Sequence, residues 1–247
     1  MNIYGEGRYR SADGAVCDTA ERSLEQLKSG RFEPTAADGG KLLAVATPEQ
    51  KLPSLSSVYA LSKSNQEQLC LMLGRAYGIP TVALRLFDTY GPRQALSNPY
   101  TGALAIFALR LLNGKPPLIF EDGLQQRDFV SVHDVARACR LALESPCAVG
   151  HAINIGSGEP VTVLSAAERV ARALGLEIRP EVTRRYRMGD VRHCFADVSL
   201  ARELLGYRPE VSLDSGLLEL VRELGRQRPA DRLDRARRGL ETRGLTL

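Results

Sequence analysis

From residue 59 onward, short apolar runs alternate with longer stretches in which apolar residues recur at helical spacing. Thr81–Phe87 (TVALRLF) and Ala152–Ile155 (AINI) are two such short runs, and each has the length of a buried strand. Strands that alternate with helices in this way usually form a largely parallel sheet with helices on its faces. The pattern therefore predicts an α/β fold.

Turn residues set the expected element boundaries. A helix over Val58–Tyr77 should end at Gly78 as a left-handed cap, because Pro80 cannot continue it. After the strand at Thr81–Phe87, residues 88–94 (DTYGPRQ) are predicted to form a loop at its carboxyl end, where ligands bind in open α/β sheets. Further helices are expected over 100–113, 133–144, 162–174, 199–205 and 213–224, and further strands over 118–120, 128–132 and 152–155.

The amino-terminal part has a different composition. Residues 8–53 are rich in Gly, Ser, Pro and charge, and only residues 22–28 show a short helical pattern. This stretch is interpreted as a long insertion or surface excursion.

Composition limits the class of protein. The chain has 44% hydrophobic residues, 25% charged residues and a net charge of +4, which suits a globular protein with a small anionic ligand. No run reaches the roughly 18 apolar residues that cross a bilayer, so no membrane association is expected. The five cysteines form no C-x-x-C pair and no signal segment is evident, which favours the cytoplasm. The arginine cluster near the carboxyl end is interpreted as a solvated helix, so no nucleic-acid partner is predicted.

Tyr59 and Lys63 form the candidate catalytic pair. They lie four positions apart in a predicted helix, so both side chains emerge on one face. Tyrosine is ordinarily a poor base at neutral pH, and a lysine ammonium beside it stabilises the phenolate. The pair therefore suits proton transfer. On spacing alone, a solvated helix face explains it equally well.

The context of this pair resembles the extended short-chain dehydrogenase/reductase family, in particular its NAD-dependent nucleotide-sugar epimerases and dehydratases. The resemblance covers nearly all residues from 58 to 209, and its motifs follow the family's order. The matching segments are SSVYALSKSNQEQLC (56–70), DTYGPRQ (88–94), IFEDGLQQRDFVSVHDVARA (119–138), HAINIGSG (151–158) and RMGDVRHCFADVSLARELLGYRP (187–209).

Within this family the chain most resembles dTDP-L-rhamnose 4-epimerases, through NIYGEGRYR (2–10) and YGPRQALSNPYTGALAIF (90–107). The resemblance implies a partial Rossmann-like, doubly wound parallel sheet that lacks its first strands, with a smaller α/β substrate-binding lobe. Residues 1–97 would be the remainder of the NAD-binding domain, with the insertion at 8–53, and residues 98–247 mainly the sugar-nucleotide lobe. It also implies a homodimer. Paired cysteines occur in the insertion of some relatives, but Cys17 has no partner there, so no metal site is expected.

The resemblance implies a specific reaction. Tyr59 would remove the proton of the sugar's 4-hydroxyl while NAD takes the hydride, and the 4-keto sugar would turn over before the hydride returns. Lys63 would hold the nicotinamide ribose, and Phe87 would lie near the nicotinamide.

Motif position also suggests ligands for the nucleotide-diphosphate sugar. Arg127 and Arg187 are the expected diphosphate ligands because the arginine fork suits phosphate oxygens. Asp190 is expected on the ribose, and Arg192 nearby is a further candidate ligand. Arg127 could instead pair with Asp128, and Arg187 could belong to a solvated cluster. Asn98, which precedes a predicted helix, either faces the ligand with that helix's free amides or caps the helix.

Three departures from the family pattern leave alternatives open. No G-x-x-G-x-x-G loop for the NAD pyrophosphate occurs, and the expected catalytic serine or threonine would precede residue 1, so the chain is expected to be truncated at its amino end. Asp88 stands where the family has asparagine, and its carboxylate would repel a diphosphate. The chain could therefore be an inactive remnant that binds a sugar nucleotide or a partner subunit. A 4,6-dehydratase or a reductase would use the same pair, but serines 54, 56 and 57 stand where a dehydratase has acidic residues.

Overall fold

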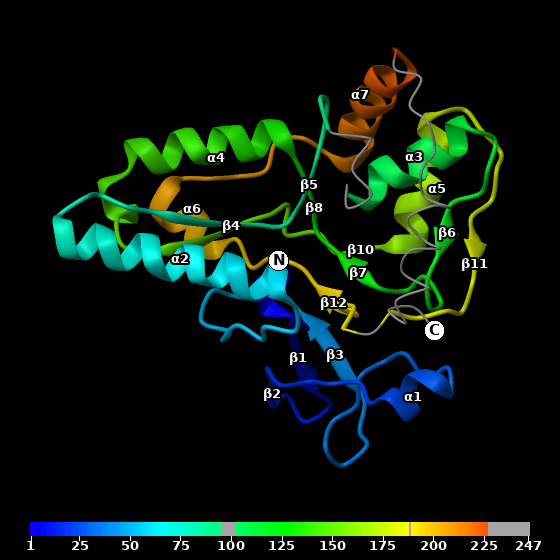
Figure 1. Ribbon diagram of the computed structural model, residues 1–247, viewed down its shortest axis with the longest axis horizontal. Helices are drawn as coiled ribbons and strands as arrows, with labels where there is room; N and C mark the ends of the chain where they lie inside the picture. Colours follow the sequence, from blue (N-terminus) through cyan, green and yellow to red (C-terminus); the bar gives the residue numbers. More distant parts are fainter. Residues whose placement is uncertain (95–101, 188, 227–247) are drawn as a thin grey trace.

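Helices and strands alternate along the chain in the computed structural model, which describes residues 1–94, 102–187 and 189–226 (Figure 1). The helices are α1 (Leu24–Lys28), α2 (Val58–Tyr77), α3 (Ala103–Leu112), α4 (Val132–Glu144), α5 (Val163–Ala173), α6 (Ser199–Leu205) and α7 (Leu213–Arg226), with short 3-10 turns η1 (Asn2–Tyr4) and η2 (Pro146–Ala148). The strands are β1 (Arg8–Ser11), β2 (Val16–Cys17), β3 (Leu42–Val45), β4 (Ala83–Leu86), β5 (Asp88–Tyr90), β6 (Leu118–Ile119), β7 (Gln126–Arg127), β8 (Phe129–Ser131), β9 (Ala152–Ile155), β10 (Val161–Thr162), β11 (Glu181–Val182) and β12 (His193–Cys194).

Parallel pairing joins strands that are distant in the sequence. β4 pairs with β9 from Ala83–Ala152 to Leu86–Ile155, and β5 pairs with β8. β6 with β11 and β7 with β12 are also parallel, whereas β10 joins β7 antiparallel. Parallel strands need long crossover connections, which helices supply here. The predicted α/β class with parallel sheets is confirmed.

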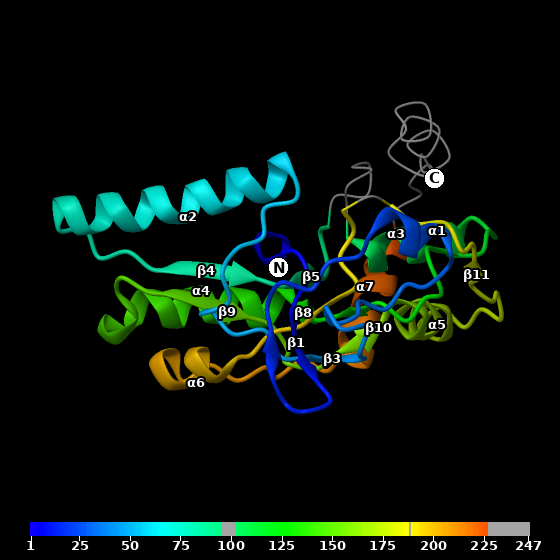
Figure 2. The same cartoon turned by 90° about the horizontal axis from the view of Figure 1, so that it is seen from below.

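Helix α2 has the predicted bounds. The Ser57 hydroxyl accepts a hydrogen bond from the Ala60 amide at 3.1 Å, and Gly78 ends the helix with a φ of 67°. The helix lies on one side of β4, and α6 lies on the other (Figure 2). Only Ala60, Ser64 and Gly74 of α2 are buried, so the helix that carries Tyr59 is held by few packing contacts within the described residues.

Apolar packing divides into separate cores. The largest joins α3, α5 and α7 through residues such as Leu104, Val170 and Leu217. A second packs α4 and α6 against β8 and β9. A smaller core combines Tyr4 and Phe87 with residues 191–196, and it fixes the end of β4 against the segment that contains the predicted substrate ligands.

The segment 8–53 is an ordered part of the structure, which the composition did not indicate. Its strands form the antiparallel sheet β2-β1-β3, and α1 lies beside them (Figure 1). Tyr9, Ala20 and Leu42 make a small core of its own. The interpretation as a long insertion or surface excursion missed this sheet because its strands are separated by stretches of turn residues and charge, which predict irregular structure locally.

Two expectations for residues 81–94 were wrong. β4 is half-buried, and Leu86 is 38% exposed, because β4 has a single strand neighbour, β9, within the described residues. Residues 88–90 form strand β5 and not a loop, because they pair with β8 in register from Asp88–Phe129 to Tyr90–Ser131. Asp88 is therefore fixed by sheet hydrogen bonds.

In the part of the chain that the structure describes, no helix is long and apolar enough to span a membrane.

Candidate active site

Tyr59 and Lys63 lie near the amino end of α2. The Lys63 Nζ atom lies 5.7 Å from the centre of the Tyr59 ring and donates a hydrogen bond to Gln66 Oε1 at 3.1 Å. The Tyr59 side chain is 57% exposed, so a ligand can reach its hydroxyl. An ammonium at this distance can stabilise a phenolate electrostatically.

A cavity of about 640 Å³ adjoins this pair. Tyr59 and Lys63 line it from α2, and Phe87 and Asp88 line it from the junction of β4 and β5. Cavities of a few hundred Å³ accommodate cofactor and substrate groups. Four of the predicted site residues, which are up to 29 positions apart in sequence, thus surround one space at the carboxyl end of a parallel strand.

A buried polar cluster ties α2 to β4. Arg85 donates two hydrogen bonds to the Glu67 carboxylate at 2.7 and 2.8 Å, and it also donates to the Tyr4 hydroxyl at 2.7 Å. Tyr4 in turn donates to Asn154 Oδ1 at 2.7 Å. Burial lowers the pKa of Arg85, but hydrogen bonds with Glu67 and with Tyr4 outweigh it, and the pKa is raised. The cluster therefore fixes the helix that carries the candidate pair, Tyr59 and Lys63.

Asp88 is a carboxylate in an unfavourable electrostatic position. Burial raises its pKa, and the charges of Asp128 and Asp190 act in the same direction. The positive charge of Arg127 partly opposes this rise, which places Arg127 within electrostatic range of the cavity.

Arg127 does not point a free guanidinium at this cavity. Its Nη1 atom donates to the carbonyl oxygens of Gln126 and Arg192 at 2.9 and 3.0 Å, and its Nη2 atom donates to the Val191 carbonyl oxygen. The same nitrogen lies 3.5 Å from Asp190 Oδ1. Arg127 thus binds the backbone of residues 191–192, and this use of its donors argues against the predicted diphosphate contact.

The alternative ion pair between Arg127 and Asp128 does not form in the described part of the chain. Successive residues of an extended chain point to opposite faces, so Asp128 points away from Arg127. Its carboxylate accepts hydrogen bonds from the Ser157, Gly158 and Ala196 amides at 2.6 to 3.0 Å.

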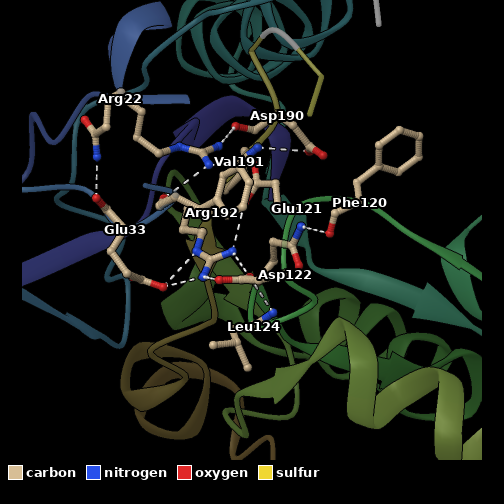
Figure 3. A network of polar contacts seen from close by, with 12 residues as sticks. Arg22, Glu33, Phe120, Glu121, Asp122, Leu124, Asp190, Val191 and Arg192 are labelled. Atoms are coloured by element: carbon tan, nitrogen blue, oxygen red, sulfur yellow. Dashed lines mark hydrogen bonds and ion pairs between the residues drawn. The ribbon is translucent and has the colours of Figure 1, made fainter. Parts of the chain in front are cut away.

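Arg192 is also unsuited to its predicted place among the diphosphate ligands. Its side chain has no exposed surface, and its Nε, Nη1 and Nη2 atoms donate to the carboxylates of Glu33, Glu121 and Asp122 (Figure 3). A guanidinium whose donors are all used by the protein's own carboxylates has none left for a phosphate.

The remaining predicted ligands are accessible, with one outside the described residues. Arg187 is exposed, and its guanidinium carbon lies 4.4 Å from the centre of the Phe120 ring. Asp190 is half-exposed and adjoins Arg127. Neither residue lines the cavity beside Tyr59. Asn98 lies outside the described residues.

Two pairs of closely spaced glycines, Gly5 with Gly7 and Gly156 with Gly158, lie in turns with internal contacts. The amides of Ser157 and Gly158 donate to Asp128, so the turn at residues 156–158 is filled by the protein's own carboxylate. The Gly7 amide donates to the His193 carbonyl oxygen at 2.7 Å. Among the described residues, neither pair offers free amides for a pyrophosphate, whereas the cavity beside Tyr59, Lys63 and Phe87 suits the nicotinamide ribose.

Sequence reasoning did not find the residues that hold the site. Arg85, Glu67 and Tyr4 come from a strand, a helix and the amino terminus, and no short motif links them. The one available signal was Arg85 itself, a charge inside an otherwise apolar strand, because such a residue needs a buried partner.

Comparisons with known proteins identify the family of the chain. A family model described as the NAD dependent epimerase/dehydratase family matches residues 2–156. The dTDP-L-rhamnose 4-epimerase of Burkholderia thailandensis is 34% identical over 218 residues, which make up 88% of this chain and 59% of that protein.

Solved structures of 4-epimerases superpose on the chain. The UDP-glucose 4-epimerase of Thermotoga maritima, solved with UDP-glucose, gives a TM-score of 0.68 at 36% identity and covers 74% of this chain and 58% of that one. The UDP-glucuronic acid 4-epimerase of Bacillus cereus, solved with UDP-glucuronic acid and NAD, gives 0.67 at 32% identity, with 74% and 57% covered. The chain thus spans less than two thirds of the length of each of these proteins. Because the family model matches more than half of its residues, the chain belongs to the NAD-dependent epimerase/dehydratase family.

Proposed function

We propose that this chain carries the catalytic helix and the substrate-binding part of an NAD-dependent nucleotide-sugar 4-epimerase. The observation that carries the proposal is the single cavity that Tyr59 and Lys63 share with Phe87 and Asp88. A proton-transfer pair, an apolar ring and a polar side chain around one space are what a sugar that reacts beside a nicotinamide requires.

Tyr59 acts as the base in this proposal. Its phenolate accepts the proton of the sugar's 4-hydroxyl and returns a proton when the 4-keto sugar is reduced on its other face. Lys63 stabilises the phenolate through its charge and is the residue that would hold the nicotinamide ribose. NAD, when bound, accepts the hydride of carbon 4 and gives it back.

The proposed substrate is a dTDP-linked 6-deoxy sugar, dTDP-L-rhamnose or its 4-epimer dTDP-6-deoxy-L-talose. The Burkholderia relative, at 34% identity over 88% of this chain, supports this choice over a UDP-sugar. Arg187 and Asp190 are the proposed contacts with the diphosphate and the ribose, since both are accessible. Arg127 is assigned to hold residues 190–192.

The proposal assigns the cofactor and the substrate to different parts of the chain, and it includes a homodimer. Residues 1–97 would serve the cofactor and the catalytic helix, and residues 98–247 mainly the nucleotide sugar. The exposed residues Leu69, Met72 and Leu73 of α2 form an apolar surface that a second copy could cover. Light scattering on the purified chain would test the dimer.

The decisive experiment uses a chimera in which the amino-terminal segment of the Burkholderia relative, with its expected glycine-rich loop, precedes residue 2. We expect epimerisation of dTDP-L-rhamnose, and Tyr59→Phe should lower turnover by a factor on the order of 100 to 10,000 while substrate affinity stays nearly constant. Tyr77→Phe is the matched control, because Tyr77 lies at the far end of the same helix and is 74% exposed. Full turnover of Tyr59→Phe would contradict the catalytic assignment. An inactive chimera that binds the sugar nucleotide would favour a non-catalytic binding protein.

A further inference from the structure

The segment 8–53 is joined to the substrate side of the molecule by largely buried charges. The ion-pair network consists of Glu6, Arg22, Glu33, Glu121, Asp122 and Arg192, and all of these except Glu6 are labelled in Figure 3. It connects three stretches of chain that are far apart in the sequence: the insertion with the residues just before it, the β6–β7 turn, and the segment that follows Arg187.

Arg22 contributes directly to the shape of that segment. Its side chain is 4% exposed, and its Nη2 atom donates to the Asp190 carbonyl oxygen at 2.6 Å. Its Nη1 atom pairs with Glu121 Oε1 at 2.6 Å, and its Nε atom lies 3.3 Å from Glu6 Oε1. Arg22 therefore fixes the backbone of a residue that is proposed to contact the ribose.

Glu6 holds the backbone of residues 192 and 193. Its carboxylate accepts hydrogen bonds from the Arg192 amide at 2.8 Å and from the His193 amide at 3.2 Å. The Tyr9 hydroxyl donates to the same carboxylate at 2.7 Å. Because Arg22 pairs with Glu6, a change in Arg22 is transmitted to the backbone of residues 192–193.

Glu33 closes the network from the insertion. It accepts hydrogen bonds from Arg192 Nε at 2.9 Å and contacts His193 Nε2 at 2.9 Å. Close by, Leu27 and Phe32 of the insertion pack against Tyr186, which immediately precedes Arg187. The insertion thus contacts residues on both sides of the two accessible substrate candidates.

The chemistry of the network argues for positioning. Replacing buried ion pairs by apolar residues is often neutral or stabilising, so charges of this kind are weak evidence for stability alone. Such ion pairs do impose geometry, because a planar guanidinium can donate hydrogen bonds only to carboxylate and carbonyl oxygens that lie in certain positions. This network concentrates such constraints on residues 190–193.

We propose that Arg22 and Glu33 are positioning residues: the insertion sets the conformation of residues 190–193 and, through the contact with Tyr186, the placement of Arg187 together with Asp190 for the nucleotide sugar. The inference rests on the proposed function for the role of those two residues. It assigns the insertion a part in substrate binding, although none of its residues lines the cavity beside Tyr59.

Hydrogen exchange on the ligand-free 247-residue chain tests the positioning. Arg22→Gln should speed exchange of the amides of residues 191–193 about tenfold or more, because two supports are lost. Arg22 pairs with the Glu6 carboxylate that accepts from the 192 and 193 amides, and it holds the backbone of Asp190, whose carboxylate accepts from the 191 amide. Exchange in α5 should not change, which separates a local effect from global destabilisation. Arg8→Gln is the matched control, since it breaks the Arg8–Asp18 pair at 2.7 Å in the same insertion without touching the network. Unchanged exchange at residues 191–193 would overturn the proposal.

A second variant guards against failure to fold. Arg22→Gln combined with Glu121→Gln leaves no uncompensated charge at that pair, and it should still speed exchange at residues 191–193. Titration calorimetry with dTDP-L-rhamnose tests the functional part: we expect about tenfold weaker binding for the Arg22 variants and Glu33→Gln, and no change for Arg8→Gln. If the wild-type chain binds and these variants bind equally well, the inference is wrong while the proposed function stands. If the wild-type chain does not bind, the proposed function fails, and the exchange data still decide whether the insertion holds the segment.

Discussion

Breaking the pair between Arg85 and Glu67 should loosen the helix that carries Tyr59. The two side chains are 10% and 15% exposed, and two hydrogen bonds of 2.7 and 2.8 Å join them. Few residues of α2 are buried, so this pair is a principal contact between the helix and β4. The perturbation is Arg85→Gln, which removes the charge and shortens the side chain.

The expected loss in unfolding free energy follows from the groups that Arg85→Gln leaves without a partner. Glu67 would keep a largely buried charge without a partner, which typically costs about 3 to 5 kcal/mol. The hydrogen bonds from Arg85 to the Tyr4 hydroxyl and to the Glu49 carbonyl oxygen would also be lost, at about 1 kcal/mol each, although water could replace part of both. We expect a total loss of about 4 to 6 kcal/mol, which is a large fraction of a typical domain's stability of about 5 to 15 kcal/mol.

Urea denaturation followed by circular dichroism measures this loss. Arg140→Gln is the matched control, because Arg140 pairs with Glu144 at 2.8 Å on α4 but the two side chains are 60% and 57% exposed, and we expect a change below about 0.5 kcal/mol. The double variant Arg85→Met with Glu67→Met should recover most of the loss, since no buried charge remains. A cost for Arg85→Gln as small as that of the control would refute the reasoning.

Three further predictions concern other parts of the molecule. Asp88→Asn should tighten nucleotide-sugar binding measured by calorimetry, because an amide replaces a carboxylate that repels the diphosphate; equal or weaker binding would contradict it. Gly156→Ala should destabilise by about 1 to 3 kcal/mol in urea, because its Cβ would meet the Asp128 carboxylate, whereas Gly225→Ala, with open space around it, should be neutral or stabilising. Burial raises the pKa of Glu33, but hydrogen bonds from His193 and Arg192 outweigh it and lower the pKa to about 2. The stability that Glu33 contributes is therefore present above its ordinary pKa of 4.5 and is lost as pH falls toward 2, so the difference in melting temperature between wild type and Glu33→Gln should shrink over that range.

Local patterns in the sequence predicted much of the fold. Gly78, Pro80 and the helical spacing before them predicted the end of α2, because capping and periodicity act over a few residues. The run at residues 152–155 became β9 as predicted. The four-residue spacing of Tyr59 and Lys63 placed both on one face of the helix, and the structure adds that Phe87 and Asp88 line the same cavity.

The small sheet of the insertion could not be predicted in the same way. β1 pairs with β3 across more than 30 residues, from Arg8–Val45 to Ser11–Leu42. The stretch between these strands carries turn residues and charge, which predict irregular structure locally. Pairing of strands that distant depends on contacts that no short window of sequence contains.

The arginines show most clearly which properties of a side chain the sequence determines and which depend on the tertiary structure. Arg187 and Arg192 are five positions apart and chemically identical, and motif position suggested phosphate contacts for both. The fold leaves Arg187 exposed and buries Arg192 completely. The difference arises because Glu33, Glu121 and Asp122, which come from the insertion and from the β6–β7 turn, meet at Arg192 and use its donors. The sequence determines that a side chain can bind an anion, but only the folded chain determines whether that anion is a ligand or one of its own carboxylates.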